Sequence, residues 1–578
     1  MKRFVLIRGA ELIALLVLAA IPVFVANPFA LGLLTLLAIY GILLIGLDVT
    51  VGYLGQVNLG QAAFLGIGAY TAGLLVVNGG YGLLPALGCA FLLCLVIGAL
   101  LALPALRLEG PQFALATLSF GALAVVVLNE WEDLTLGAQG LSVSRPPLFG
   151  HELDAAWFYW LCIGLLALVW LGMRNLLSSQ WGRAFEALRD SPIATDAMGI
   201  GTYRHKVIAF AFGSALGGLA GGLYSFNFQY LQPQSFTYEL MVILLLGVVL
   251  GGRKSLWGAV VGAAFIVLLP NLLSSQGMFR LFSVVGLAIA LVAPVRALIK
   301  GKAGKTAFRF QTLAPIFAMG LLVVGSFTVQ HTEDWRKAIF ALMLFSVVVG
   351  LPEGLMGYAG KLLTQLFKLP PAPLPAPSNL DDVLPIQPAD AKVLLELREL
   401  KRHFGGVKAV DGVNMQVRAG TVHGLIGPNG SGKSTAVNVI SGLYAPTSGQ
   451  LLLDGEELPY GSLYRVAGAG VARTFQNLQL FGELSALDNV MVALRDTYHL
   501  PWPLVLLGLS QKEEARAQAD ALALLQLMGL QNQAQTKAKD LTYGAQRFLE
   551  IARALARKPR LLILDEPAAG LAQPDANQ

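Results

Sequence analysis

The stretch Gly427-Pro428-Asn429-Gly430-Ser431-Gly432-Lys433-Ser434-Thr435 decides the fold of the C-terminal part of this 578-residue chain. A short apolar run at 422–426 precedes it, and an apolar helical pattern follows it through Ile440. Glycines between a strand and a helix let backbone N–H groups surround a phosphate, and the helix N-terminus adds the positive end of its dipole. This order of strand, glycine-rich loop, Gly-Lys-Ser and helix predicts a P-loop that binds nucleotide phosphates, with every residue of the quoted stretch a candidate contact.

Two residues of the motif have distinct predicted roles, and an acidic partner lies further along the chain. We expect Lys433 to reach the outer phosphates of ATP and Ser434 to be a ligand of Mg²⁺. The apolar run at 561–564 reads as a buried strand, and Asp565-Glu566 follow it directly. We expect Asp565 to hold Mg²⁺ through water and Glu566 to polarise the attacking water as general base.

The chain as a whole has the composition of a membrane protein. Hydrophobic residues make up 55% and charged residues 13%, and the mean hydropathy is +0.64, whereas soluble domains carry about 25% charged residues. Charged residues are sparse in 1–300 and frequent in 391–578, which separates an apolar part from a soluble part. A wholly soluble or disordered chain is therefore excluded. The net charge of +6 is spread over both parts, so we expect no nucleic-acid partner.

Apolar runs of about 20 residues predict about ten transmembrane helices, in contact with membrane lipid. The candidate spans lie at 4–26, 30–51, 59–78, 83–106, 112–129, 155–173, 206–226, 281–299, 312–329 and 338–356. Segment 240–270 is apolar too, but Gly251-Gly252-Arg253-Lys254 interrupts it. Each half is then too short to span, which predicts a broken or re-entrant helix. The fold expected is an all-α multi-pass membrane domain followed by an α/β P-loop NTPase domain.

These patterns divide the chain into four predicted parts. They are a transmembrane domain at 1–300, an extra transmembrane hairpin at 301–360, a proline-rich linker at 361–391 and an ATP-binding domain at 392–578. The linker contains Pro370, Pro371, Pro373, Pro375, Pro377, Pro385 and Pro388. Closely spaced prolines favour an extended backbone, so we expect a semi-rigid spacer between the two halves.

The soluble part resembles an ATP-binding cassette (ABC) ATPase of the branched-chain amino-acid uptake systems. The resemblance rests on Phe404-Gly405-Gly406, Arg473-Thr474-Phe475-Gln476, Leu541-Thr542-Tyr543-Gly544-Ala545-Gln546, and the stretches at 549–555 and 566–571. It implies that Phe404 stacks on adenine and that Gln476 is the Q-loop glutamine, which contacts Mg²⁺. It also implies that Thr542, Tyr543 and Gly544 belong to the signature loop, which closes on an ATP held by the P-loop of a second cassette.

Residues 40–299 are similar to the permease of the same systems, above all at 52–70, 182–200 and 247–262. Segment 182–200 corresponds to the permease's coupling loop, so we expect loop 174–206 to be cytoplasmic and to contact a cassette. The resemblance implies a fused permease and ATPase subunit that takes up branched-chain or other hydrophobic amino acids, in the bacterial inner membrane with the cassette in the cytoplasm. The implied partners are a second permease subunit, a second ATPase subunit and a periplasmic substrate-binding protein.

Two alternatives remain open at this stage. One is an importer of urea or short-chain amides, and the other is an ATP-binding membrane scaffold without transport. The sequence stops at Gln578, and no histidine follows His499, although related cassettes have further strands and a switch histidine. We therefore expect a cassette truncated at its C-terminus, which binds Mg-ATP and, as an ATP hydrolase, turns it over slowly by itself.

Overall fold

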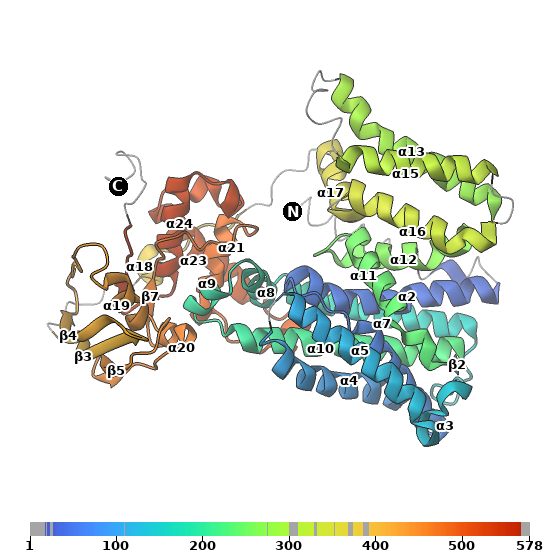
Figure 1. Ribbon diagram of the computed structural model, residues 1–578, viewed down its shortest axis with the longest axis horizontal. Helices are drawn as coiled ribbons and strands as arrows, with labels where there is room; N and C mark the ends of the chain where they lie inside the picture. The colour runs from blue at the N-terminus through green and yellow to red at the C-terminus, as the bar shows by residue number, and fades with distance from the viewer. Residues whose placement is uncertain are drawn as a thin grey trace. The chain divides into compact units, whose positions relative to one another are not determined.

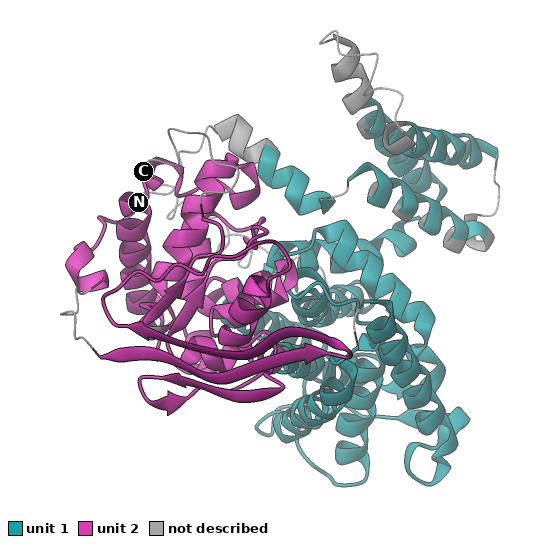
Figure 2. Ribbon diagram, turned by 60° about the vertical axis from the view of Figure 1, so that its left-hand side comes forward, with its two compact units in different colours: residues 1–173, 206–372 teal, residues 174–205, 373–578 magenta. Residues whose placement is uncertain are grey.

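The computed structural model describes residues 18, 20–22, 27–108, 110–273, 275–299, 310–328, 332–351, 353–367, 374–384 and 392–567. The chain forms two compact units, coloured separately in Figure 2. Unit 1 comprises residues 1–173 and 206–372, and unit 2 comprises residues 174–205 and 373–578. Unit 2 therefore combines the C-terminal half of the sequence with one loop of the N-terminal half.

Unit 1 is built from helices, labelled in Figure 1. They are α2 (Pro28–Asp48), α3 (Gln61–Val77), α4 (Leu83–Ala105), α5 (Pro111–Glu130), α6 (Glu132–Thr135), α7 (Ala155–Leu177), α10 (Thr202–Phe228), α11 (Tyr238–Gly251), α12 (Leu256–Leu272), α13 (Gln276–Ile299), α15 (Phe310–Thr328), α16 (Thr332–Gly350) and α17 (Gly354–Phe367). Strands β1 (Leu141–Ser142) and β2 (Tyr230–Leu231) form a short antiparallel pair. Helices α7 and α10 run on into unit 2.

Polar side chains determine where several of these helices begin. Asn27 caps α2 by accepting the N–H of Phe29 at 3.0 Å, and Ser255 caps α12 by accepting the N–H of Gly258 at 3.0 Å. A side-chain oxygen at this position satisfies one of the backbone donors that a helix start leaves unpaired. Ser255 thus begins a new helix directly after the interruption predicted at 251–254.

Small residues bring the helices of unit 1 into close contact. A Cβ on Gly68 of α3 would lie 2.2 Å from the carbonyl oxygen of Gly218 in α10, so the two backbones meet where neither residue has a side chain. The polar stretch before α3 is also used for packing. The Leu59 N–H donates to the Thr117 hydroxyl at 3.0 Å, and the Gln61 amide donates to the carbonyl of Gly213 at 3.0 Å.

The prediction of ten spans is wrong. Within the described ranges, six helical stretches are long and apolar enough to cross a membrane, or seven if a bent pair at 341–350 and 354–361 counts as one span. Three predicted spans instead hold shorter apolar helices, at 61–77, 276–288 and 313–328, and the helix at 256–272 is short, as expected for half of the interrupted segment. Stretch 233–251, expected to be too short, is one of the six. A hydropathy profile gives the length of an apolar stretch, but capping residues and turns divide such a stretch into shorter helices. Candidate 4–26 lies largely outside the described residues.

Unit 2 contains an antiparallel sheet, a parallel strand pair and a group of helices. Its strands are β3 (Val393–Phe404), β4 (Val407–Arg418), β5 (Ser448–Leu453), β6 (Glu456–Glu457), β7 (Val471–Arg473) and β8 (Leu561–Ile563). Its helices are α8 (Gln180–Asp190), α9 (Pro192–Ala197), α18 (Leu380–Val383), α19 (Lys433–Ile440), α20 (Leu463–Gly468), α21 (Ala486–Ala493), α22 (Trp502–Leu506), α23 (Gln511–Leu527) and α24 (Tyr543–Ala556).

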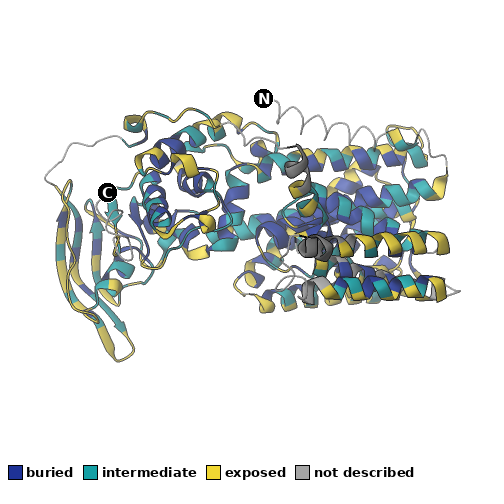
Figure 3. Cartoon of the chain, turned by 90° about the horizontal axis from the view of Figure 1, so that it is seen from above, coloured by how far each residue is buried: buried dark blue, intermediate teal, exposed yellow. Residues whose placement is uncertain are grey.

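Two hydrophobic clusters organise unit 2. The sheet has the strand order β4-β3-β5-β6, and its inner side chains, including Leu397 and Leu451, pack with Val439 and Ile440 of α19. Figure 3 shows exposed residues along the strands of this sheet. The second cluster joins α21, α23 and α24. Thus the P-loop helix belongs to the sheet cluster, and the signature-loop helix belongs to the helical cluster.

Apart from the run at 561–564, which forms strand β8 at Leu561–Ile563 but is half-buried rather than buried, two local expectations differ from the structure. Residues 422–426, expected to form the buried strand before the P-loop, have no regular secondary structure, and Val422 and Ile426 are exposed. A buried strand needs a neighbour for its backbone groups, and among the described residues nothing pairs with this one.

The second difference is in the proline-rich linker, part of which is attached to unit 2 rather than acting as a spacer. Val383 of α18 is buried in the helical cluster. The Ser378 hydroxyl donates to the carboxylate of Asp520 in α23 at 2.5 Å, and the Ser378 N–H donates to the carbonyl of Ala519 at 3.0 Å. Apolar burial and backbone pairing together anchor residues 378–383 on α23.

Candidate functional site

The P-loop stretch turns directly into α19, as its sequence predicts. Lys433 is the first residue of this helix, and Ser434 and Thr435 follow in its first turn. The Lys433 ammonium group folds back over the loop and donates to the carbonyls of Gly427 and Pro428, at 2.5 and 2.8 Å. The loop at 427–432 is exposed except for Gly432 at its end, which is half-buried. The lysine therefore lies over an accessible loop.

Gly432 is the residue in this loop that tolerates no side chain. Its φ is +89°, in the left-handed region, and a Cβ there would lie 2.2 Å from the carbonyl oxygen of Ala409 in β4. Only glycine meets both conditions without strain. The close approach to β4 determines the direction in which α19 leaves the loop.

The predicted metal and catalytic residues meet where β7 and β8 end. These strands pair in parallel, with Arg473 opposite Ile563, so the residues that follow both strands lie at one edge. The Gln476 amide lies 3.4 Å from a Glu566 carboxylate oxygen, and the Asp565 N–H donates to the Thr474 hydroxyl at 3.1 Å. The structure thus brings Gln476 and Glu566 together and places Asp565 beside them.

Arg473 links this edge to the P-loop helix. Its guanidinium donates to Asn438 and Ser441 at the end of α19, at 2.8 and 2.7 Å, and lies 3.4 Å from an Asp565 carboxylate oxygen. Burial lowers the pKa of Arg473, and the nearby carboxylates of Asp565 and Glu550 partly offset that effect. One buried cation therefore connects the predicted phosphate-binding helix to the predicted metal ligand.

Phe404, the predicted adenine contact, ends β3 and is 40% exposed. Its ring packs edge-on against Tyr444, with centroids 5.4 Å apart, and the guanidinium of Arg402 lies 4.4 Å from its centroid. The ring therefore has one supported side and one accessible side. Tyr444 and Arg402 were not singled out from the sequence.

The predicted signature-loop residues are placed apart from the P-loop helix. Thr542 is the N-cap of α24, and Tyr543 and Gly544 form its first turn. Helix α24 packs in the helical cluster, whereas α19 packs in the sheet cluster. The resemblance assigns these residues to the ATP of a second cassette, and this separation within one chain is consistent with that assignment.

Three buried charged residues on α24 hold the segment at 475–479, which contains Gln476. Arg547 donates to the carbonyls of Phe475 and Gln476 at 2.8 and 2.7 Å. Glu550 accepts the N–H of Phe475 at 3.0 Å and pairs with Arg547 at 3.1 Å. Arg553 donates to the carbonyl of Gln479 at 2.7 Å. Their spacing of three residues places them on one helix face. In the sequence this stretch contributes only to the family resemblance, although three charges at that spacing in a helix that also contains apolar residues are themselves a signal.

The loop at 174–205 contacts the cassette within unit 2, which confirms the contact expected for it. Arg183 of α8 donates to Glu514 and to the hydroxyl of Tyr498, both at 2.7 Å. The pair is largely buried, with exposed side-chain fractions of 10% for Arg183 and 14% for Glu514. Removal of only one partner from a buried charge pair of this kind destabilises the folded protein by roughly 3–5 kcal/mol.

A second set of contacts joins this loop to the segment after Gln476. The Ser191 hydroxyl donates to the side-chain oxygen of Gln479 at 2.8 Å, and Asp190 accepts the N–H of Glu483 at 3.0 Å. Ser191 also caps α9 by accepting the N–H of Ala194. The segment at 476–483 therefore contacts the catalytic edge at one end and the loop of the N-terminal half at the other.

Comparisons with known proteins match both halves of the chain. Residues 29–294 match the family model for the branched-chain amino acid transport system permease component, and residues 410–569 match the ABC transporter family model. The high-affinity branched-chain amino acid transport ATP-binding protein BraF of Pseudomonas aeruginosa is 42% identical over 31% of this chain and 72% of its own length. The permease protein LivM of Escherichia coli K12 is 32% identical over 49% of this chain and 72% of its own length.

The ATP-binding protein LivG of Escherichia coli K12 matches the same part of the chain as BraF, with 41% identity over 31% of this chain and 71% of its own length. The permease-like and ATPase-like matches cover different residues of one polypeptide. This chain belongs to the ABC transporters of the branched-chain amino acid transport family, with a permease component and an ATP-binding component fused in one polypeptide.

Proposed function

We propose that the chain is a subunit of an importer that takes up branched-chain or other hydrophobic amino acids across the bacterial inner membrane. In this proposal the helices of unit 1 form one half of the translocation pathway, and the cassette lies in the cytoplasm. The names of the relatives BraF and LivM support the substrate class. The preference for one amino-acid substrate over another depends on residues outside the nucleotide site.

The observation that carries the proposal is the docking of loop 174–205 on the cassette. Arg183 and Ser191 of the permease part hold Glu514 and Gln479 of the ATPase part. A scaffold that only bound ATP would need no permease loop attached to the segment next to Gln476. In the proposed importer, movement of this segment during the nucleotide cycle displaces α8 and α9, and through them the helices α7 and α10.

The nucleotide site has the groups that Mg-ATP requires. Gly432 allows the loop to approach Ala409 of β4 closely, and Lys433 lies over the exposed loop. Lys433 neutralises the outer phosphates, and Ser434 and Asp565 hold Mg²⁺, with Gln476 as a further ligand. The other P-loop residues contribute backbone N–H groups, and the accessible side of Phe404 faces adenine.

In the same proposal, Glu566 accepts a proton from the water that attacks the outer phosphate, and Gln476 orients that water. Thr542, Tyr543 and Gly544 close on the nucleotide of a second cassette. The complex therefore includes a second ATPase subunit and a second permease subunit, and it receives its substrate from a periplasmic binding protein. Bound Mg-ATP supplies the free energy of cassette closure and of phosphoryl transfer.

Uptake by reconstituted vesicles tests this function. The chain is placed in proteoliposomes with the second permease, the second ATPase and the binding protein, and radiolabelled leucine and urea are offered separately with ATP on the cassette side. We expect ATP-dependent accumulation of leucine and none of urea. The Lys433→Ala variant is the matched control, because it removes one cation from the P-loop and leaves the permease part unchanged.

Other outcomes separate the alternatives. Accumulation of urea without leucine would replace the substrate class with small amides. ATP binding without accumulation of either solute, in a complex containing every partner, would contradict transport and favour a scaffold.

A further inference from the structure

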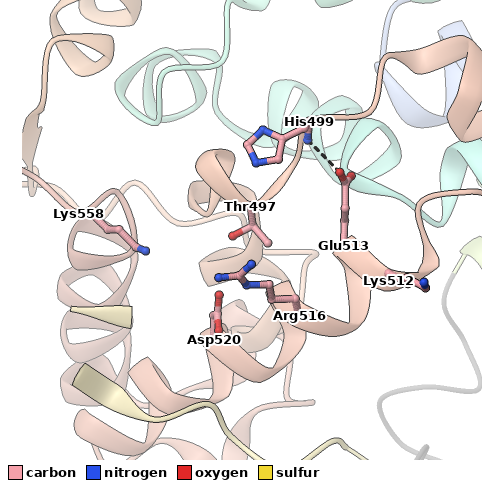
Figure 4. A pocket seen from close by; sticks show the side chains of 7 residues that line it. All are labelled: Thr497, His499, Lys512, Glu513, Arg516, Asp520 and Lys558. Atoms are coloured by element: carbon pink, nitrogen blue, oxygen red, sulfur yellow. Dashed lines mark hydrogen bonds between the residues drawn. The ribbon is translucent and has the colours of Figure 1, made fainter. Parts of the chain in front are cut away.

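The helical part of unit 2 contains a cavity that is separate from the nucleotide site. It has a volume of about 380 Å³, which lies in the usual range for small-molecule sites. Three segments surround it, as Figure 4 shows. Thr497 and His499 belong to the loop after α21, Arg516 and Asp520 to α23, and Lys558 to the turn after α24. None of these residues is part of the predicted P-loop, Q-loop or signature loop.

The lining of this cavity has three basic side chains, Lys512, Arg516 and Lys558, and two acidic ones, Glu513 and Asp520. Arg516 and Lys558 point into the cavity from opposite sides, from α23 and from the end of α24 (Figure 4). Neither side chain makes a hydrogen bond or ion pair within the described part of the chain, and neither does Lys512 at the rim. Cations from separate helices that converge without a protein partner form a favourable site for an anion.

Each of the two carboxylates in the lining accepts a hydrogen bond from the protein. Glu513 accepts the N–H of His499 at 3.1 Å, and its other carboxylate oxygen is buried with no hydrogen-bond partner among the described residues. Asp520 is 8% exposed and accepts the hydroxyl of Ser378 from the anchored linker at 2.5 Å. These hydrogen bonds to Ser378 and His499 hold the walls in place, and the three basic side chains of the lining outnumber its two carboxylates, which leaves a net positive formal charge.

We propose that this cavity binds a small molecule with a phosphate or diphosphate group. Arg516 offers a planar set of N–H donors that matches phosphate oxygens, and Lys558 adds a point charge from the opposite side. The Thr497 hydroxyl is positioned beside them (Figure 4). The volume exceeds that of an inorganic phosphate ion and leaves room for an organic group.

The site shares its walls with the docking contact of loop 174–205. Thr497 and His499 line the cavity, whereas Tyr498 between them contacts Arg183. In α23, Glu513 lies on the cavity side and its neighbour Glu514 pairs with Arg183. A ligand that bridges Arg516 and Lys558 would restrict the motion of the loop at 497–499 and of the start of α23. These two segments contact Arg183 through Tyr498 and Glu514. The effect of the ligand on transport rests on the proposed function, but its binding does not.

Binding is tested on the full-length chain in nanodiscs, in the Lys433→Ala background so that the P-loop does not compete for phosphate. Pyrophosphate and AMP are titrated separately by calorimetry. We expect pyrophosphate to bind, and the pair R516Q/K558Q to weaken binding by at least about tenfold through the loss of two charge-assisted contacts. The pair R418Q/R465Q, which removes two exposed charges outside the cavity, should bind pyrophosphate normally.

A second measurement distinguishes the loss of ligand binding from misfolding of the variant. Hydrogen exchange at 495–499 should slow when pyrophosphate is added to the Lys433→Ala chain and remain unchanged in R516Q/K558Q, whose circular dichroism should match that of R418Q/R465Q. Tighter binding of AMP than of pyrophosphate would identify a nucleotide as the source of the phosphate. The absence of pyrophosphate and AMP binding, or binding that R516Q/K558Q leaves intact, would overturn the proposal while leaving leucine uptake untouched.

Discussion

The hydroxyl of Ser191 donates a hydrogen bond of 2.8 Å to the side-chain oxygen of Gln479. Arg553 donates to the main-chain carbonyl of the same residue at 2.7 Å. Gln479 is thus held on one side by the cap of α9 and on the other by the helix that starts at the signature loop. Gln479 lies three residues after Gln476 and is bonded to both α24 and α9. A displacement of α24 relative to the catalytic edge is therefore transmitted to α9 through Gln479.

The first prediction separates this bridge from helix capping. Ser191→Ala removes both the bridge and the cap of α9, whereas Gln479→Leu removes the bridge alone. Both variants should lower leucine transport per ATP hydrolysed to a similar extent. Only Ser191→Ala should also lose stability, by about 1 kcal/mol, because a helix cap is lost. Thermal unfolding and coupled uptake and ATPase assays measure the two effects.

The double variant of Ser191 and Gln479 tests whether the two residues act through one hydrogen bond. If Ser191 and Gln479 act through one hydrogen bond, the loss of coupling in Ser191→Ala/Gln479→Leu should be no larger than in either single variant. Additive losses would mean that the two residues act independently.

A second prediction distinguishes binding from chemistry at the nucleotide site. Lys433→Ala should weaken ATP binding by at least about tenfold, because a charged contact to phosphate is lost. Glu566→Gln should bind ATP normally, and its turnover in the complete complex should fall by about 10²- to 10⁴-fold, because the general base is lost. Fluorescent-nucleotide binding and phosphate release measure the two quantities. Normal turnover in Glu566→Gln would remove Glu566 from the proposed chemistry.

A third prediction concerns the anchored linker. Ser378→Ala leaves the buried Asp520 carboxylate without its hydroxyl donor and should destabilise the helical cluster by about 1–3 kcal/mol. Val383→Ala opens a small cavity in the same cluster and should act in the same direction. Asp382→Ala, an exposed neighbour on the same turn, is the matched control and should have little effect. Equal stability of all three variants in thermal unfolding would show that residues 378–383 act as a free spacer.

The sequence was sufficient for the features that local motifs define. The P-loop before α19, the Asp565-Glu566 pair after β8 and the contact of loop 174–205 with the cassette follow from short patterns with a known chemical purpose. The family assignment rested on the same patterns. In the first two cases the residues that matter are adjacent in the chain. The loop contact joins residues 331 and 288 positions apart, and it was expected only from the resemblance to a permease.

Features that depend on distant partners could not be predicted in the same way. The run at 422–426 looks like a buried strand, but a strand forms only where a neighbour pairs with it. The spans were overcounted because the helices at 61–77, 276–288 and 313–328 are shorter than the apolar stretches predicted there. The anchoring of Ser378 depends on Asp520, which lies 142 residues away, and no pattern around the prolines identifies that partner.

A fourth prediction concerns acidity. Hydrogen bonds from Lys539 and Lys537 lower the pKa of Glu483 to about 2. Because this folded-state pKa lies below the ordinary value, the carboxylate stabilises the folded cassette above about pH 4.5, and the contribution is lost as the pH falls from there toward 2. The Glu483 side chain is 38% exposed, so solvent screening limits the effect to less than about 1 kcal/mol.

The Glu483→Gln variant tests this sign. Its stability deficit relative to the unmodified chain, measured by denaturant unfolding, should be largest near neutral pH and should shrink as the medium is acidified. High salt should reduce the deficit at neutral pH, because the two lysines are accessible to solvent. A deficit that grows on acidification would contradict the assignment.

The last prediction concerns Arg553, a residue that is 1% exposed. Burial lowers its pKa to about 10, and its Nε and one terminal nitrogen have no hydrogen-bond partner among the described residues. A buried cation with so few partners contributes little to stability, and replacement by an apolar side chain of similar length is often neutral. Arg553→Met should therefore change the free energy of unfolding by less than about 2 kcal/mol, since removal of the unpaired charge offsets the lost bond to Gln479.

Transport should respond differently from stability in the same Arg553→Met variant. Without the bond to the Gln479 carbonyl, α24 no longer holds the segment that Ser191 contacts, so leucine uptake per ATP hydrolysed should fall while ATP binding stays normal. Arg465→Met, on the exposed side of α20, is the control and should leave both unchanged. Arg553→Lys keeps the charge but loses the planar geometry, so it should fail to restore uptake. If Arg553→Met unfolded the cassette, Arg553 would be a structural residue; if it transported normally, Gln479 would need no anchor on α24.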